Sequence, residues 1–148
     1  MSIPFHLTDE LKLIRETLEN LGIRPLIADR KPPQFLFHDV CDLISNAMFG
    51  VFEVTETNEN VFVEYGMMVE QGKPAILLYN RAKRKDELGS NMKGILQTRY
   101  THLDEITPGL SETIHTLPRK MRPPDGSVLK NCLDLYALLE KIKGALVL

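Results

Sequence analysis

The sequence predicts an α/β fold in which a mostly parallel sheet of about four to five strands carries helices on both faces. Two segments, Phe49–Val54 and Ala75–Tyr79, are apolar at nearly every position, and a helical pattern over Val61–Gln71 separates them. Strands that are apolar on both sides belong to covered sheets, and a helix between two such strands makes them run parallel. The crossovers are then expected to be right-handed and the sheet doubly wound.

The first half of the chain alternates between helix and strand patterns. Thr8, followed by two acidic residues, is a good helix start, apolar residues recur behind it at helical spacing, and Gly22 ends the run. We expect a short strand at Arg24–Ala28 and a helix at His38–Ala47. The segment between them, Asp29–Leu36, holds two consecutive prolines and is predicted to be a loop.

The second half continues the alternation less regularly. Asn80–Met92 is rich in charge and is expected to be a solvated surface loop. A fourth strand is predicted near Gln97–His102 and a helix at Pro108–Leu117. Met121–Ser127 resembles a hinge, and the proline-free stretch Val128–Leu148 is predicted to form one closing helix.

Composition narrows the function classes. The 148 residues suit a single domain spanning 1–148, and 18 basic against 20 acidic residues provide no general field for a nucleic-acid polymer. The longest uncharged run, Leu43–Phe52, has 10 residues, far fewer than a membrane span needs. No signal peptide is evident, and the two cysteines lie in no pairing motif, which favours the cytoplasm. The four histidines have no metal-ligand spacing, so we expect no metal site.

In a flavodoxin-like strand order, ligands bind between the loops that follow the first and third strands. Here those loops are Pro4–Thr8 and the polar run Thr55–Asn60. If a helix begins near Asn60, this residue shares a face with Glu64, whose carboxylate then lies near the positive amino end of the helix, which favours its ionised form.

A carboxylate held in a cleft can act as a nucleophile or stabilise an oxocarbenium-like centre, as in retaining glycoside hydrolysis. Asn58 and Asn60 can hydrogen-bond sugar hydroxyls, because amides both donate and accept. The alternative is purely structural, since asparagine and threonine before a helix are ordinary caps and a glutamate in the first turn is ordinary dipole chemistry.

A longer pattern surrounds this loop. A strand ends in Glu53-Val54-Thr55, Asn58-Glu59-Asn60-Val61-Phe62-Val63-Glu64-Tyr65-Gly66 follows, and Gly72-Lys73-Pro74 precedes another apolar strand. In this order and spacing, the stretch from Cys41 to Tyr79 resembles the nucleoside 2-deoxyribosyltransferase-like and Toll/interleukin-1 receptor (TIR)-like superfamily. Weaker resemblance extends over Phe5–Asp29 and the strand near Tyr100.

The resemblance implies a flavodoxin-like fold and an enzyme that cleaves or exchanges the N-glycosidic bond of nucleosides, nucleotides or NAD. It also implies that Glu64 is the catalytic carboxylate and that Asn58 occupies a substrate-binding position. Three features depart from the family pattern: Glu53 replaces an aspartate, Asn58 replaces the acid of the transferases, and the first strand is reduced to Met1–Ile3.

Further substrate-binding candidates lie in the first loop and at predicted strand ends: Phe5, His6, Glu53, Tyr79 and Arg81. Each has a plainer alternative, since His6 can be a solvated turn residue, Glu53 can pair near a strand end, and Tyr79 and Arg81 can be an ordinary strand-end aromatic and a solvated charge. Arg30 and Lys31 can meet a phosphate or simply belong to a surface loop.

The leading hypothesis is a nucleoside- or nucleotide-directed N-glycosidase or glycosyltransferase without a cofactor, for which NAD is a candidate substrate. The rival is a non-catalytic nucleotide-sensing or oligomerising domain of a signalling or defence system, and a third possibility is a plain protein-interaction domain. The expected partners are a small nucleoside or nucleotide and further copies of the chain, with neither a membrane nor a nucleic-acid polymer among them.

Overall fold

The structure is a computed structural model that describes residues 8–27, 33–84, 96–117 and 145–147. Its elements, in chain order, are α1 (Thr8–Asn20), β1 (Pro25–Leu26), α2 (Pro33–Asn46), β2 (Phe49–Glu53), α3 (Glu59–Glu70), β3 (Ala75–Asn80), β4 (Leu96–Tyr100), the 3₁₀ turn η2 (Leu103–Glu105), α4 (Ile106–His115) and β5 (Ala145–Val147). Helices and strands therefore alternate through most of the described chain, as an α/β fold requires.

The centre of the sheet is the parallel set β2-β3-β4. In the register of these strands Glu53 lies beside Leu78, and Asn80 lies beside Tyr100. β1 and β5 extend the sheet on the other side of β2, also in parallel, so the full order is β1-β5-β2-β3-β4. The predicted α/β class with a parallel sheet is confirmed.

Two predicted segments are wrong in part. The closing helix does not reach the chain end as predicted, because Ala145–Val147 is a strand between β1 and β2. A short apolar run fits a helix as well as a strand, and only pairing with distant residues decides between them. The predicted loop Asp29–Leu36 is also too long, since α2 begins at Pro33, where the missing N–H and fixed φ of proline suit a first helical turn. The hinge and the remainder of the predicted closing helix lie outside the described residues.

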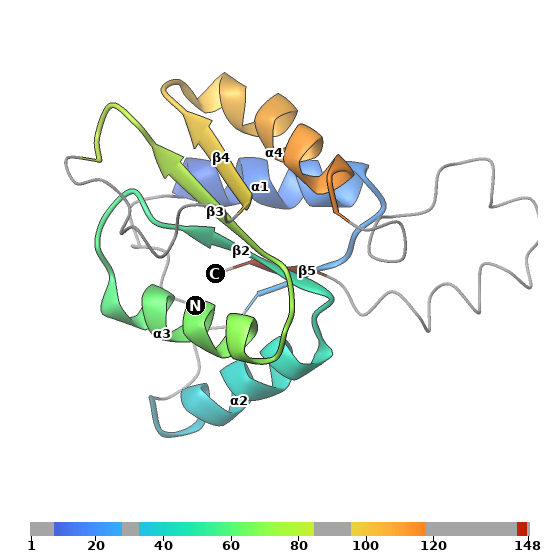
Figure 1. Ribbon diagram of the computed structural model, residues 1–148, viewed down its shortest axis with the longest axis vertical. Coiled ribbons are helices and arrows are strands. Elements are labelled where there is room, and N and C mark those ends of the chain that lie inside the picture. Colours follow the sequence, from blue (N-terminus) through green and yellow to red (C-terminus); the bar gives the residue numbers. More distant parts are fainter. Residues whose placement is uncertain (1–7, 28–32, 85–95, 118–144, 148) are drawn as a thin grey trace, which may run out of the picture.

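Helices cover both faces of the sheet, with α1 and α4 on one side and α2 and α3 on the other (Figure 1). Alternate residues of β2 point to opposite faces, so Val51 joins the core beneath α1 and α4, whereas Phe52 joins the core beneath α2 and α3. Both cores are almost entirely aliphatic and aromatic. The parity of β2 also assigns Glu53 to the same face as Val51.

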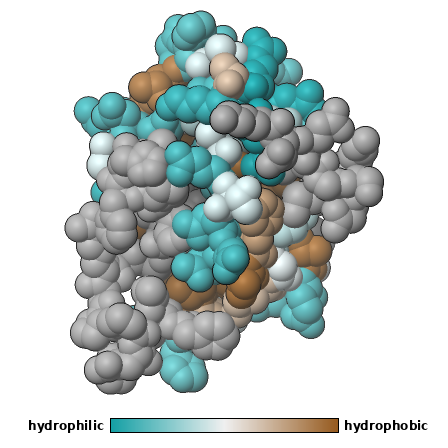
Figure 2. Space-filling model, turned by 90° about the vertical axis from the view of Figure 1, so that its left-hand side faces the viewer, coloured by the Kyte–Doolittle hydropathy of each residue, from teal (hydrophilic) through white to brown (hydrophobic). Residues whose placement is uncertain are grey.

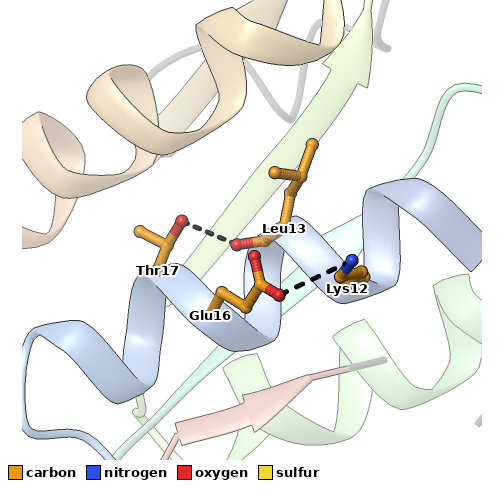
Figure 3. A network of polar contacts seen from close by, with 4 residues as sticks. All are labelled: Lys12, Leu13, Glu16 and Thr17. Carbon is orange, nitrogen blue, oxygen red and sulfur yellow. Dashed lines mark hydrogen bonds and ion pairs between the residues drawn. The ribbon is translucent and has the colours of Figure 1, made fainter.

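α1 is tied to its neighbour by a buried hydroxyl. Thr17 donates a hydrogen bond of 2.7 Å to the carbonyl of Leu13 and lies 3.0 Å from the hydroxyl of Thr107 in α4. On the solvent side of the same helix, Lys12 and Glu16 form a loose ion pair of 3.9 Å (Figure 3). Exposed pairs of this kind contribute little, so the buried face holds α1 in place.

Two glycines decide how α3 meets the sheet. Gly72 has φ +66° and reverses the chain between α3 and β3, a conformation that L side chains rarely adopt. Gly50 lies in β2 beneath α3, where an added Cβ would come within 2.5 Å of the Phe52 ring and 3.1 Å of the Met68 methyl. The absence of a side chain at position 50 therefore lets α3 approach the strand closely.

The strands β2, β3 and β4 all end at one edge of the molecule, the left-hand edge in Figure 1. Figure 2 views that edge directly, and there hydrophobic side chains reach the surface in the lower half, next to hydrophilic ones. In parallel sheets this edge is where ligands bind. None of the helices that the structure describes has the length and apolar character to span a bilayer.

Candidate functional site

The loop between β2 and α3 carries the predicted site, and its asparagine caps the helix. Asn58 has extended backbone angles (φ −123°, ψ 115°), and its side-chain oxygen accepts a 3.0 Å hydrogen bond from the backbone N–H of Asn60. α3 therefore begins at Glu59, two residues before the predicted start. The capping alternative for Asn58 is present in the structure, and its role in binding sugar stays a prediction.

Glu64 lies in the interior, although it carries a carboxyl group. It is the sixth residue of α3, and the residue is only 8% exposed. Val61, Tyr65 and Met68 of the same helix are buried against the sheet, where the Tyr65 ring meets Phe52 edge-on at 5.6 Å between centroids. The Oε2 atom of Glu64 has no hydrogen-bond partner among the described residues.

Burial raises the pKa of the Glu64 carboxyl above its ordinary value. This corrects the prediction that the helix amino end favours its ionised form. The free N–H groups of a helix belong to its first four residues, and Glu64 lies beyond them. Loss of hydration therefore dominates at this position, and the protein holds a buried carboxyl that is reluctant to ionise and has one oxygen without a hydrogen-bond partner among the described residues.

Glu53 lies on the opposite face of the sheet and is fully engaged. It is 2% exposed, and its carboxyl accepts hydrogen bonds from the Thr55 hydroxyl, from the Thr55 backbone N–H at 3.2 Å and from the Tyr100 hydroxyl at 3.2 Å. Burial raises its pKa, the hydrogen bonds from Thr55 and Tyr100 oppose the rise, and the nearby carboxylate of Glu10 adds to it. Its predicted substrate contact stays a prediction.

Tyr100, in β4, completes the buried hydrogen-bonded group around Glu53. Burial is the main cause that raises the pKa of its hydroxyl, and the carboxyl groups of Glu53 and Glu10 add to the effect. Thr55 links the group to the next strand, because its oxygen also accepts a 2.8 Å bond from the backbone N–H of Asn80. One hydrogen-bonded network thus joins the ends of β2, β3 and β4.

The two candidates at the end of β3 turn toward β4. The Tyr79 hydroxyl lies 3.4 Å from the amide oxygen of Gln97, and the Arg99 guanidinium stands 5.9 Å from the centre of the Tyr79 ring. Arg81 donates from Nε to the hydroxyl of Thr101 at 2.6 Å. The structure does not bring either residue into a described contact with Glu64, and their roles toward a ligand stay predictions.

Arg84 was not among the predicted site residues, but it contacts the end of β2, where the loop to α3 begins. Arg84, in the stretch predicted to be solvated, is half-buried and donates from Nη1 to the carbonyl of Val54 at the end of β2. One sequence feature could have pointed to Arg84: an asparagine at the end of a strand, followed by basic residues. The high charge of this stretch indicated a solvated loop instead.

Of the remaining candidates, only Asn60 belongs to the described residues. Phe5, His6, Arg30 and Lys31 lie outside the described residues. Asn60 is exposed on α3, one helical turn before Glu64. Within the described part of the chain, no three His, Cys, Asp or Glu side chains gather in a way that could hold a metal ion.

No protein-family model, curated protein or solved structure matches the chain.

Proposed function

We propose that the protein is a nucleoside- or nucleotide-directed N-glycosidase or glycosyltransferase in which Glu64 acts at the sugar C1′. The observation that carries the proposal is the buried Glu64 carboxyl with an oxygen that has no partner among the described residues. An unsatisfied buried polar atom costs about 1–3 kcal/mol, so a ligand that completes its bonding gains that free energy on binding. The resemblance of the surrounding segment to the deoxyribosyltransferase-like and TIR-like superfamily supports the same role.

In this mechanism an oxygen of ionised Glu64 forms a bond to C1′ while the C1′–N bond breaks and its electron pair leaves with the base. A purine or pyrimidine then takes a proton from water, whereas the nicotinamide of NAD leaves as a neutral molecule and takes none. Water then attacks C1′ in a hydrolase, or a second base does so in a transferase, and Glu64 is released. Asn58 and Asn60 would hold the sugar hydroxyls at the start of α3. NAD is a candidate substrate, and no cofactor enters the scheme.

The proposal includes a flavodoxin-like, doubly wound fold. The sheet order β1-β5-β2-β3-β4 and the helices on both faces support it. Such a fold binds ligands outside the carboxyl ends of its strands, where the loop from Thr55 to Asn58 begins. A cytoplasmic location stays a prediction.

The test is base release from a panel of nucleosides, nucleoside monophosphates and NAD, separated by liquid chromatography. Glu64→Gln should lower the rate at least about 100-fold, because the amide cannot form the bond to C1′. The matched control is Glu70→Gln, a change of the same kind at an exposed position of the same helix, which should keep the wild-type rate. No release from any substrate, or equal release by Glu64→Gln, would contradict the proposal.

A second candidate function is the non-catalytic, oligomerising domain. It is favoured by Val63 and Val69, which are 56% and 48% exposed on the outer side of α3. Light scattering over a range of concentrations tests it, with Val63→Lys as the variant. Concentration-dependent association that this substitution abolishes supports the candidate, and a monomer at every concentration argues against it.

A further inference from the structure

Thr55 is the first polar residue of the loop that leads from β2 to α3 (Figure 1), and it is only 7% exposed. Its hydroxyl donates to the Glu53 carboxyl and accepts the 2.8 Å hydrogen bond from the backbone N–H of Asn80. Its own backbone N–H donates to the other oxygen of Glu53 at 3.2 Å. Thr55 therefore fixes the start of the loop to its own strand and to β3.

The far end of the loop is fixed by Asn58. Its side chain accepts from the backbone N–H of Asn60, and its carbonyl accepts a 3.2 Å hydrogen bond from the backbone N–H of Phe62, the first bond of the α3 ladder. Only Glu56 and Thr57, both exposed, separate Thr55 from Asn58. So short a connection has little slack, and a displacement of Thr55 is therefore passed on to Asn58 and the start of α3.

The hydroxyl group explains why a threonine suits this position. A hydroxyl donates one hydrogen bond and can accept others, so one side chain serves both the Glu53 carboxyl and the N–H of Asn80. Serine can do the same, whereas valine has the shape of threonine but neither donates nor accepts. With valine, the N–H of Asn80, a buried residue, would lose its acceptor.

We propose that Thr55 is a positioning residue for the reaction at Glu64, because it holds the loop between β2 and α3 so that Asn58 and the start of α3 keep the place that the sugar requires. Thr55 does not touch the substrate in this scheme and acts through Asn58. The inference rests on the function proposed above and adds a residue to the same site.

Steady-state base release, with the substrate panel described above, measures the effect on activity. Thr55→Val should lower kcat about 10- to 100-fold, because a displacement of about 1 Å at a reacting group can cost that much. Thr55→Ser keeps the hydroxyl and should keep the wild-type kcat. The matched control is Thr98→Val, which removes another buried threonine hydroxyl, bonded at 2.7 Å to Thr113, and should leave kcat unchanged.

Amide hydrogen exchange followed by NMR reports on the loop without any substrate. The backbone N–H of Phe62 should exchange about tenfold faster in Thr55→Val than in the wild-type protein, because its acceptor is the carbonyl of Asn58. The N–H of Gln71, which donates to the Met67 carbonyl at the other end of α3, should keep its rate. Thr55→Ser and Thr98→Val should change neither rate.

Thr55→Ala is the second variant if Thr55→Val does not fold, which circular dichroism would show. Alanine also lacks the hydroxyl but places no extra methyl group against the N–H of Asn80, and it should give the same losses. The inference is overturned if a folded variant without the hydroxyl keeps the wild-type exchange rate at Phe62, if Thr98→Val gives the same losses, or if Thr55→Ser behaves like Thr55→Val.

The two measurements also separate this inference from the proposed function. If the wild-type protein releases no base from any substrate, the glycosidase proposal fails, and exchange at Phe62 still decides whether Thr55 holds the loop. If Glu64→Gln abolishes base release but Thr55→Val does not lower kcat, the glycosidase proposal stands and Thr55 is not a positioning residue.

Discussion

Glu53 and Glu64 are both buried, and they lie on opposite faces of the same sheet. The oxygens of Glu53 accept hydrogen bonds from Thr55 and Tyr100, whereas Oε2 of Glu64 has no partner among the described residues. Burial raises the pKa of both carboxyl groups. The two residues therefore differ in what surrounds them and hardly at all in how deeply they lie.

The difference separates a structural acid from a candidate for chemistry. A buried carboxyl that accepts several hydrogen bonds ties together the elements that donate them. For Glu53 these are the ends of β2 and β4. A buried carboxyl without a complete set of partners weakens the fold and gains most when a ligand supplies the missing contact. We therefore expect the fold to depend on Glu53 and the activity to depend on Glu64.

The largest expected effect is a loss of stability when Glu53 is replaced. Glu53→Ala leaves the hydroxyls of Tyr100 and Thr55 without their acceptor inside the protein, so the free energy of unfolding should fall by about 3 kcal/mol. Urea denaturation followed by circular dichroism measures it. A loss as small as that from an exposed substitution such as Glu70→Gln would mean that Glu53 does not hold the sheet end together.

A second test concerns the packing of α3, the helix that carries Glu64. Gly50→Ala forces a methyl group against the Phe52 ring and should destabilise the protein by about 2 kcal/mol. Gly66→Ala is the matched control, because nothing lies within 4 Å of a Cβ there, and alanine in a helix should add about 0.5–1 kcal/mol. Thermal melts of the two variants should shift in opposite directions, and shifts of the same sign would contradict the close approach of α3 to β2.

Removing one donor from the Glu53 group should have a smaller effect. Tyr100→Phe keeps the ring but deletes the hydroxyl that donates to Glu53, at an expected cost of about 1.5 kcal/mol. Because that hydrogen bond lowers the pKa of Glu53, the variant should also raise this pKa further. Urea denaturation and carboxyl titration by NMR measure the two effects, and an unchanged pKa would argue against the hydrogen bond.

The smallest effect is a gain of stability at Glu64, and it depends on pH. A carboxyl whose pKa is raised in the folded state contributes stability that is fully present below its ordinary value of 4.5 and is lost as the pH rises through the folded-state pKa. Glu64→Gln cannot ionise, so it should be about 1 kcal/mol more stable than the wild-type protein at pH 8.

Urea denaturation at a series of pH values between 4 and 8 follows this difference. The stability advantage of Glu64→Gln should shrink as the pH falls toward 4. A variant that is less stable than the wild-type protein at pH 8 would show that the Glu64 carboxylate is stabilised in the folded state, contrary to the comparison with Glu53.

Many of the helices and strands are predictable from local sequence patterns. The apolar runs of β2 and β3, the helix behind Thr8 and the asparagine before α3 are all readable from neighbouring residues, because strand and helix periodicities and caps are local properties. The strand at Ala145–Val147 was not predictable in this way, since its pairing partners lie about a hundred positions earlier in the chain. The contact of Arg84 with Val54 joins residues thirty positions apart, so no local pattern predicts it.

The sequence by itself determined that the protein alternates helices and strands, that a polar loop follows a buried strand, and that a glutamate stands behind that loop. Tertiary structure alone decided that Glu53 is bonded on one face of the sheet while an oxygen of Glu64 has no described partner on the other. It also decided that burial raises the pKa of the Glu64 carboxyl. The physical reason is that hydrogen-bond partners and loss of water come from residues far apart in the chain, and only the folded packing brings them together.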